Sequence, residues 1–213
     1  MPELMIDLIC SLDGYAAADG WPGLWGMAGP EYVAWLGEQE EHTILMGATT
    51  YRLMSGMAEE EPEAIAQLGE MPKIVFSSTL SPPLGWANSD LVSGDAVAAV
   101  RDLKQRHPLP MRTLGSLALG RSLLAAGLVD RLRLVVFPVI NGSTGRERLF
   151  DGYPDVRLDL LEALDVVARD LKTGRLDLDR RPPENEVAAL LHASSPDRRG
   201  IVERTVCRAQ RLQ

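Results

Sequence analysis

The chain has 213 residues, of which 46% are hydrophobic and 24% are charged, and its formal net charge is −8. These values predict a globular protein of one domain, or of one domain with an extension. The acidic balance argues against a nucleic-acid partner, because phosphate backbones select basic surfaces.

The two cysteines, Cys10 and Cys207, form neither a disulfide framework nor a zinc-binding pattern. No apolar run approaches the roughly 20 residues that cross a bilayer, and the acidic amino terminus does not resemble a signal peptide. Carboxylates and histidines show no metal-ligand spacing. We therefore expect a cytoplasmic protein with no metal site and no membrane partner.

Strand and helix signals alternate along the chain, as short apolar runs and as amphipathic runs that follow a capping residue. Strands are expected at Leu4–Cys10, Thr43–Met46, Lys73–Phe76, Asp90–Val92, both ends of 111–140, Val156–Arg169 and Gly174–Arg180. Helices are expected at Pro30–Glu41, Ala48–Ser55, Ala96–Arg106 after an N-cap at Asp95, and in the middle of 111–140. A loop rich in glycine and tryptophan covers 11–29, and 56–71 is acidic and irregular with at most a short helix.

The end of the chain differs in character from the rest. The last two predicted strands are expected to pair in antiparallel fashion through the turn Lys172-Thr173-Gly174. From Pro182 onward the sequence is punctuated by proline and ends rich in arginine. We therefore divide the chain into a domain at 1–181 and a C-terminal extension at 182–213, a helix or tail that packs on the domain or on a partner.

The alternation of elements predicts an α/β fold with three layers, α/β/α. Its central sheet is expected to be mostly parallel, with right-handed crossovers and an antiparallel edge strand at the C-terminal end. In such sheets ligands bind at the carboxyl ends of the strands.

Glycine and hydroxyl residues follow three of the predicted strands. The three sets are Gly47 with Thr49 and Thr50, Ser77 with Ser78 and Thr79, and Gly115 with Ser116. Each set taken alone is typical of a plain turn. Together, backbone N–H and hydroxyl groups at neighbouring strand ends, next to helix starts, are suited to an extended polyanionic ligand.

The segment GSLALGRSLLAAGLVDRLRLVVFPVINGSTGRERLF, which begins at Gly115, resembles the carboxyl-terminal half of the dihydrofolate reductase-like superfamily. The shared marks are a glycine pair, here Gly115-Ser116, then paired leucines, Gly-Leu-Val-Asp, a proline after a strand and a closing Leu-Phe. The strings SLDGYAA, ILMGATTYRLM and VFSSTL resemble the first three strand ends of that superfamily. The resemblance is to the branch with the C-terminal reductase domain of the bifunctional riboflavin-biosynthesis deaminase-reductase, and it covers about residues 4–180.

This resemblance implies a reductase that takes hydride from NADPH. Carried over by position, the cofactor-binding residues are Gly47, Thr49 and Thr50 at the phosphates, Ser77 and Ser78 near the adenosine, and Gly115, Ser116, Leu117 and Ala118 at the pyrophosphate. Many relatives have an arginine after the second-strand glycine, suited to the 2′-phosphate of NADPH, whereas this chain has Ala48. NADH therefore stays open as the cofactor, and Arg52, one helical turn on, is a candidate replacement.

On the substrate side the resemblance implies Asp13 and Glu31 as catalytic residues and Trp25 as a substrate-binding residue. In dihydrofolate reductases an acid at the spacing of Glu31 anchors the pterin ring, and a carboxylate accepts paired hydrogen bonds from an N–C–N edge. Structural alternatives stay open for all three. An acid is favoured in the first turn of any helix, an aspartate before glycine is typical of a turn, and a tryptophan packs in cores and rims.

The predicted function is that of an NADPH-dependent reductase of a small heterocyclic or carbonyl substrate, acting as a homodimer as the riboflavin branch commonly does. The alternative is a nucleotide-binding or interaction protein that keeps the fold and has lost the chemistry. A flavodoxin-like phosphate-binding module is disfavoured, because the terminal antiparallel pair departs from a doubly wound order.

Overall fold

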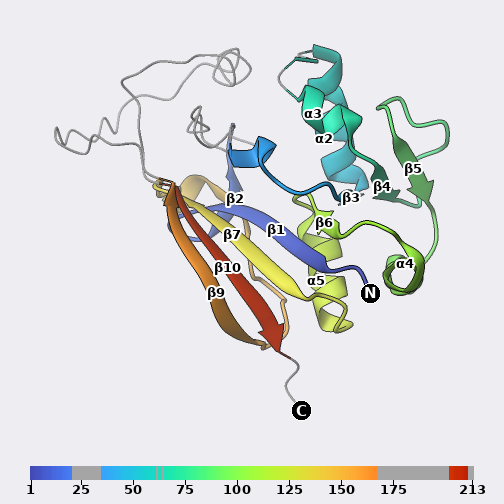
Figure 1. Ribbon diagram of the computed structural model, residues 1–213. Helices are drawn as coiled ribbons and strands as arrows, with labels where there is room; N and C mark the ends of the chain where they lie inside the picture. Colours follow the sequence, from blue (N-terminus) through green and yellow to red (C-terminus); the bar gives the residue numbers. More distant parts are fainter. Residues whose placement is uncertain (21–34, 61, 64, 167–201, 211–213) are drawn as a thin grey trace.

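The computed structural model describes residues 1–20, 35–60, 62–63, 65–166 and 202–210 (Figure 1). Its main sheet has eight strands in the order β5-β4-β3-β6-β1-β7-β10-β9. In chain order these strands are β1 (Leu4–Ser11), β3 (Thr43–Gly47), β4 (Lys73–Phe76), β5 (Ser89–Val92), β6 (Met111–Thr113), β7 (Arg131–Phe137), β9 (Arg157–Val166) and β10 (Val202–Gln210). The strands from β5 to β7 are parallel, and β10 is antiparallel to both of its neighbours. The predicted mostly parallel α/β sheet is confirmed.

Helices on the two faces of this sheet complete the three predicted layers. They are α2 (Ala48–Glu60), α3 (Ala66–Glu70), α4 (Ala96–Arg106) and α5 (Leu117–Ala125). The alternation of side chains along β3 separates two cores. Ile44 and Met46 pack with residues of α2 and α3, whereas Leu45 packs with residues of α4 and α5. In Figure 1 α2 and α3 accordingly lie above the sheet and α5 below it.

Helix boundaries follow the local capping chemistry. α4 begins where predicted, because Asp95 Oδ1 accepts hydrogen bonds from the backbone N–H of Val97 (2.8 Å) and Ala98 (3.3 Å). The helix predicted to reach Glu41 is too long, since the described helical turn ends at Gly37. α2 runs to Glu60, beyond its predicted end, because good helix formers continue past its interior glycine.

A second, two-stranded antiparallel sheet joins β2 (Tyr15–Ala18) to β8 (Gly145–Arg148), in segments predicted as loops. Arg148 lies over the Tyr15 ring at 4.7 Å. Glycine is needed at 145, because a Cβ there would lie 2.5 Å from that ring. The contacts that make this sheet join residues about 130 positions apart, so no short window of sequence predicts them.

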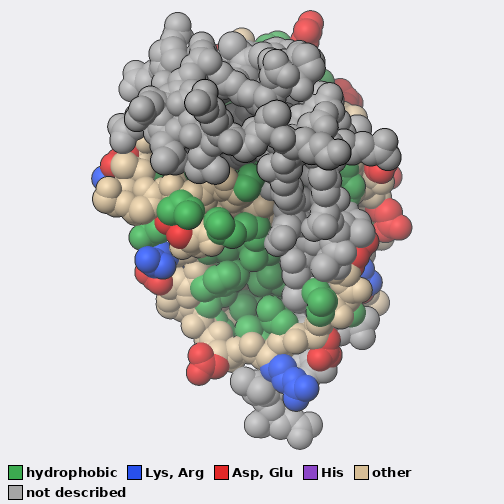
Figure 2. Space-filling view, turned by 90° about the vertical axis from the view of Figure 1, so that its left-hand side faces the viewer, with side chains coloured by type: hydrophobic (Ala, Val, Ile, Leu, Met, Phe, Trp, Pro, Cys, Tyr) green, Lys and Arg blue, Asp and Glu red, His purple; other side chains and the backbone are tan. Residues whose placement is uncertain are grey.

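The antiparallel end of the sheet differs from the prediction. β9 pairs with β10, and the strand expected at 174–180 lies outside the described residues. β10 comes from the segment predicted as an appendage and lies between β7 and β9. The place of β10 was not predicted, because a local turn signal does not show which distant strand lies next to β7. Figure 2 shows the β9 side of the molecule, where hydrophobic side chains gather at the centre of the face.

The aspartate of the Gly-Leu-Val-Asp motif joins three elements of the fold. Asp130 Oδ2 accepts a hydrogen bond from Leu4 N (2.8 Å) at the start of β1, and it pairs with the buried Lys104 of α4. Lys104 Nζ also donates to the Leu128 carbonyl (3.0 Å). The motif therefore has a structural role, since it fixes α4 and the turn before β7 against the first strand.

Candidate cofactor and substrate site

The three strand ends that carry glycine and hydroxyl residues belong to adjacent strands. β4, β3 and β6 are neighbours in the sheet and run parallel, so their carboxyl ends open on the same edge. This edge brings together Gly47, Ser77 and Gly115, each at or just after the end of its strand. The three strand ends that the predicted polyanion site requires therefore lie together.

Ser116 connects two of these strand ends directly. Its hydroxyl accepts a hydrogen bond from the Gly47 backbone N–H at 2.9 Å. The same oxygen lies 2.9 Å from Thr50 Oγ1 and 3.0 Å from the Leu114 carbonyl. One side chain thus holds the turn before α2 against the turn before α5.

The backbone at this turn is unusual. Gly115 and Ser116 both adopt positive φ, at 52° and 60°. For Ser116, which carries a Cβ, the left-handed region costs about 1–2 kcal/mol. The three contacts of its hydroxyl offset that cost, so a serine is accommodated at this position. At Gly115 itself a Cβ would lie 3.4 Å from Thr50 Oγ1.

Two helices begin at the two turns that Ser116 connects, α2 at Ala48 after β3 and α5 at Leu117 after β6. The Ser116 hydroxyl makes no capping bond to the first turn of α5, because it is engaged with Thr50 and Leu114. Neither first turn contains an acidic side chain. First-turn amides that are not capped by their own N-cap residue, at the positive end of a helix dipole, are donors suited to an anion.

The turn after β4 is shaped by its own side chains. Ser77 Oγ accepts hydrogen bonds from the backbone N–H of Thr79 and Leu80, both at 3.0 Å. Thr79 Oγ1 in turn accepts from Arg52 Nη2 at 3.0 Å. Arg52 of α2 therefore lies beside the end of β4, within the predicted cofactor edge, and Ser77 shapes the turn through its side chain.

The other predicted cofactor residues border the same turns. Thr49 is exposed on the first turn of α2, Ala118 is exposed on the first turn of α5, and Leu117 is half-buried beside it. Ser78 is exposed after β4. All predicted cofactor residues thus lie at this one edge of the sheet.

Asp13 lies just after the neighbouring strand β1, and its carboxylate accepts three hydrogen bonds. It accepts hydrogen bonds from Ser11 Oγ (2.7 Å), Gly142 N (2.9 Å) and Asn141 N (3.1 Å). Although partial burial acts to raise the pKa of Asp13, these hydrogen bonds lower it below its ordinary value. The carboxylate therefore stays ionised near neutral pH and ties the turn after β1 to the loop after β7.

The two remaining predicted site residues, Trp25 and Glu31, lie outside the described residues. The chain is described again from Trp35, four positions after Glu31.

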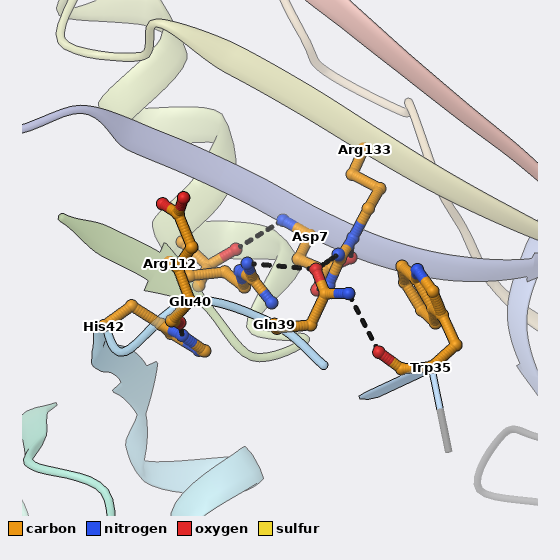
Figure 3. Close-up of polar contacts among 8 residues, drawn as sticks. Asp7, Trp35, Gln39, Glu40, His42, Arg112 and Arg133 are labelled. Atoms are coloured by element: carbon orange, nitrogen blue, oxygen red, sulfur yellow. Dashed lines mark hydrogen bonds and ion pairs between the residues drawn. The ribbon is translucent and has the colours of Figure 1, made fainter. Parts of the chain in front are cut away.

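A buried polar network that the sequence analysis missed holds this returning segment (Figure 3). Arg133 of β7 donates through Nε to Asp7 Oδ1 of β1 (2.8 Å), and its Nη2 pairs with the other carboxylate oxygen. Its Nη1 donates to Gln39 Oε1 at 2.7 Å, and Gln39 Nε2 donates to the Trp35 carbonyl at 2.9 Å. The Arg133 guanidinium also stacks 4.5 Å from the Trp35 ring. Opposite charges inside two apolar strands, LMIDLIC and RLRLVVF, were the available signal.

The network borders an open cavity of about 490 Å³, which Trp35, His42 and Arg112 help to line. Burial, and next the charge of Arg112, lower the pKa of His42. The cavity also touches Met111 and Arg131, the first residues of β6 and β7. It therefore opens at the amino ends of these strands, at the other end from the turns that carry the predicted cofactor residues.

Comparison with known proteins agrees with the fold and the site geometry described above. Residues 2–170 match the family described as the RibD C-terminal domain. The chain belongs to the RibD C-terminal domain family. No curated protein matches the chain in a sequence comparison.

Solved structures with the same fold cover nearly the whole chain. A putative riboflavin biosynthesis protein from Shewanella sp. PV-4 is 18% identical, with a TM-score of 0.64 and coverage of 98% of this chain and 99% of its own. A dihydrofolate reductase from Enterococcus faecalis, complexed with NADP(H) and RAB-propyl, is 12% identical, with a TM-score of 0.57 and coverage of 98% and 97%. A pyrimidine reductase-like protein from Corynebacterium diphtheriae is 16% identical, with a TM-score of 0.56 and coverage of 99% and 93%. This RibD C-terminal domain thus has the dihydrofolate reductase-like fold that the sequence motifs predicted.

In the part of the chain that the structure describes, the His, Cys, Asp and Glu side chains form no group of three or more that could hold a metal ion. None of its helices is long and apolar enough to cross a membrane.

Proposed function

We propose that this RibD C-terminal domain is an NADPH-dependent reductase of a small heterocyclic or carbonyl substrate. The observation that carries the proposal is the paired start of α2 and α5, held together by the contacts of Ser116 with Gly47 and Thr50. Two adjacent helix N-termini form a seat for a pyrophosphate, because both dipoles and both sets of first-turn amides act on the same anion. Family membership and the reductase-type fold support the same reading.

The residues at this edge fit a dinucleotide. The backbone N–H groups of Leu117 and Ala118 and the first turn of α2 would hold the pyrophosphate, with glycine at 115 leaving room for close approach. The turn at Ser77–Thr79 follows β4, which is the neighbour of β3, and it would lie toward the adenosine end of the dinucleotide. When bound, NADPH supplies the hydride and the protein supplies placement.

Asp13 is assigned a positioning role in this reaction. Its three hydrogen bonds and its lowered pKa make it a poor proton donor near neutral pH. It orients the ends of β1 and β7, which lie side by side in the sheet. Glu31 stays the predicted residue for substrate orientation or proton delivery, and Trp25 stays a predicted substrate contact.

The substrate is proposed to be of the riboflavin-pathway or dihydrofolate type. The alternative, a nucleotide-binding protein without chemistry, is not favoured, because the family and the fold are both of the reductase type. NADPH oxidation measured with dihydrofolate and with 5-amino-6-(5-phosphoribosylamino)uracil tests the activity directly. Turnover of either compound supports the reductase, whereas tight NADPH binding without turnover of either would favour the alternative.

The cofactor seat is tested with a charge placed in the first turn of α5. Ala118→Asp should weaken NADPH binding at least about tenfold, because a carboxylate would face the pyrophosphate. The same change is favourable to the helix, since an acid at the N-terminus complements the dipole. Nicotinamide fluorescence titration measures the affinity, and thermal unfolding confirms that the fold is intact.

Ala118→Asn is the matched control, because it has nearly the same size and no charge. We expect it to keep most of the affinity. Equal binding by the Asp and Asn variants would place the dinucleotide elsewhere. If the unchanged protein binds neither NADPH nor NADH below millimolar concentration, the proposed function is wrong.

Arg52 is proposed to select NADPH over NADH. Its guanidinium already lies beside the turn after β4, within 3.0 Å of Thr79 Oγ1, and a planar guanidinium is suited to a phosphate. Arg52→Ala should therefore weaken NADPH binding about tenfold and leave NADH binding nearly unchanged. A parallel loss for both dinucleotides in the fluorescence titration would contradict this role, and Arg101→Ala on the exposed face of α4 is the control.

A further inference from the structure

Tyr153 lies between the end of β8 and the start of β9, and its side chain reaches the first turn of α5. Its hydroxyl donates a hydrogen bond to the Leu117 carbonyl at 3.3 Å. The ring is half-buried against the core on the α5 side of the sheet, and it meets the Phe150 ring edge-on with the ring centres 5.6 Å apart. Tyr153 therefore lies beside the turn that the proposed function assigns to the pyrophosphate.

The segment that carries Tyr153 is also anchored where it leaves β8. Leu149 is 1% exposed, and its backbone N–H donates to the Gly14 carbonyl at 3.0 Å. At the other end of the segment, the Tyr153 N–H donates to the Phe150 carbonyl at 3.1 Å. The place of the hydroxyl is thus set before any ligand binds, which lowers the cost of ordering the site.

The approach of Tyr153 to α5 depends on a glycine inside that helix. Gly120 is buried, and a Cβ at this position would lie 2.9 Å from the Tyr153 hydroxyl oxygen. The next contacts of such a Cβ would be with Ile6, at the ordinary van der Waals distances of 3.5 and 3.7 Å. Glycine is unfavourable inside a helix relative to alanine. Here it leaves the space that the hydroxyl occupies.

The Leu117 carbonyl and the Ala118 N–H belong to the same peptide unit. Because this unit is planar and trans, its C=O and N–H point in opposite directions, and a partner that fixes one of them fixes the other. A hydrogen bond donated to the carbonyl also polarises the N–H and strengthens it as a donor. Ala118 is the second residue of α5, where a helical N–H has no partner within the helix and points out of its N-terminus.

We propose that Tyr153 is a positioning residue for the dinucleotide, whose hydroxyl directs and strengthens the Ala118 N–H as a donor to the pyrophosphate through its bond to the Leu117 carbonyl. The inference rests on the proposed function, because it concerns the same seat. Burial raises the pKa of Tyr153 above its ordinary value of 10.0, although the charge of Arg121 acts in the opposite direction. The hydroxyl therefore keeps the proton that it donates near neutral pH.

Tyr153→Phe removes the hydroxyl and keeps the ring. It should weaken NADPH binding about fivefold in the fluorescence titration, which is the usual effect of one hydrogen bond. In nuclear magnetic resonance spectra, the shift that NADPH induces in the Ala118 amide proton should be smaller than in the unchanged chain. A tyrosine that only supported the fold would lower the melting temperature and leave both the affinity and this shift unchanged. Tyr15→Phe, at another half-buried tyrosine, is the matched control and should bind NADPH normally.

Gly120→Ala tests the same contact without changing the tyrosine. The added Cβ would displace the hydroxyl, so this variant should weaken NADPH binding by a similar factor. In the Tyr153→Phe background, the atom that the Cβ meets is gone, and Gly120→Ala should cause little further loss.

The outcomes separate this inference from the proposed function. If the unchanged chain binds neither NADPH nor NADH, both are wrong. If it binds NADPH and Tyr153→Phe binds equally well, the inference alone is overturned. Losses from Tyr153→Phe and Gly120→Ala that simply add would also overturn it, because the two changes would then act on different contacts.

Discussion

At the scale of single residues, charged groups inside apolar strands organise this protein. Arg133 and Asp7 lie on adjacent strands, and Arg133 reaches from the sheet to the segment that begins at Trp35. All three nitrogens of the guanidinium are used, two on Asp7 and one on Gln39. The Arg133 guanidinium holds the strands and an irregular segment together, because each of its hydrogen bonds has a fixed direction.

Arg133→Met should reduce the free energy of unfolding by about 3–5 kcal/mol, because it leaves the Asp7 carboxylate without its partner in a buried site. The double variant Asp7→Leu with Arg133→Met should cost much less than the single one, since no uncompensated charge remains. Urea unfolding with a common m-value measures both. Strictly additive losses would show that the two side chains do not act as a pair.

Ser116 shows how a residue that departs from a family pattern can be accommodated. The left-handed backbone that suits a glycine is kept, and the extra hydroxyl bonds to the turn before α2. The departure therefore gains an interaction that a glycine could not make. Asp13 shows the reverse case, in which a predicted catalytic carboxylate is engaged by hydrogen bonds from its own chain.

At the scale of elements, α3 depends on one buried lysine at the start of β4. Lys73 Nζ donates to the carbonyls of Leu68 (2.6 Å), Gly69 (3.0 Å) and Met71 (2.6 Å). It also lies 4.5 Å from the centre of the Trp86 ring. The helix is only five residues long, so these carbonyls at its C-terminal end have few partners within the helix itself. The lysine caps α3 and fixes it to the sheet.

Burial lowers the pKa of Lys73 from 10.5 to about 8, and Glu70 partly opposes this effect. Between these two values the unfolded chain binds a proton that the folded chain has released. The free energy of unfolding should therefore rise with pH from about 8 to about 10.5, at up to about 1.4 kcal/mol per pH unit. The Lys73→Met variant should lack this rise.

The measurement is the difference in unfolding free energy between the unchanged chain and Lys73→Met, taken at several pH values. Other groups that titrate in the same range are common to both proteins and cancel in the difference. A difference that is constant with pH would contradict the lowered pKa. Lys172→Met, which changes a lysine in the predicted turn, is the control for charge alone.

At the scale of the whole molecule, the strand order determines which residues meet. The adjacency of β4, β3 and β6 joins three turns that are about 30 to 70 residues apart in the chain into one edge. The insertion of β10 between β7 and β9 gives the sheet its antiparallel end and leaves β9 as the last strand among the described residues.

Local patterns in the sequence were sufficient for much of this structure. The strands β1, β3, β4 and β5 and the helix α4 are recognisable because their apolar spacing and capping residues act within a few positions. The glycine and hydroxyl residues of the cofactor edge are recognisable for the same reason. Motif order then identified the family, which the match over 2–170 confirms.

Contacts between distant segments were decided only in the tertiary structure. The Ser116–Gly47 bond, the Asp7–Arg133 pair and the Asp13 bonds to the loop after β7 join residues 69 to 129 positions apart. The same holds for β10, because no hairpin signal in the sequence predicts its position beside β7. The physical reason is that backbone geometry and capping depend on near neighbours, whereas a hydrogen bond or ion pair across strands depends on which strands the whole sheet makes adjacent.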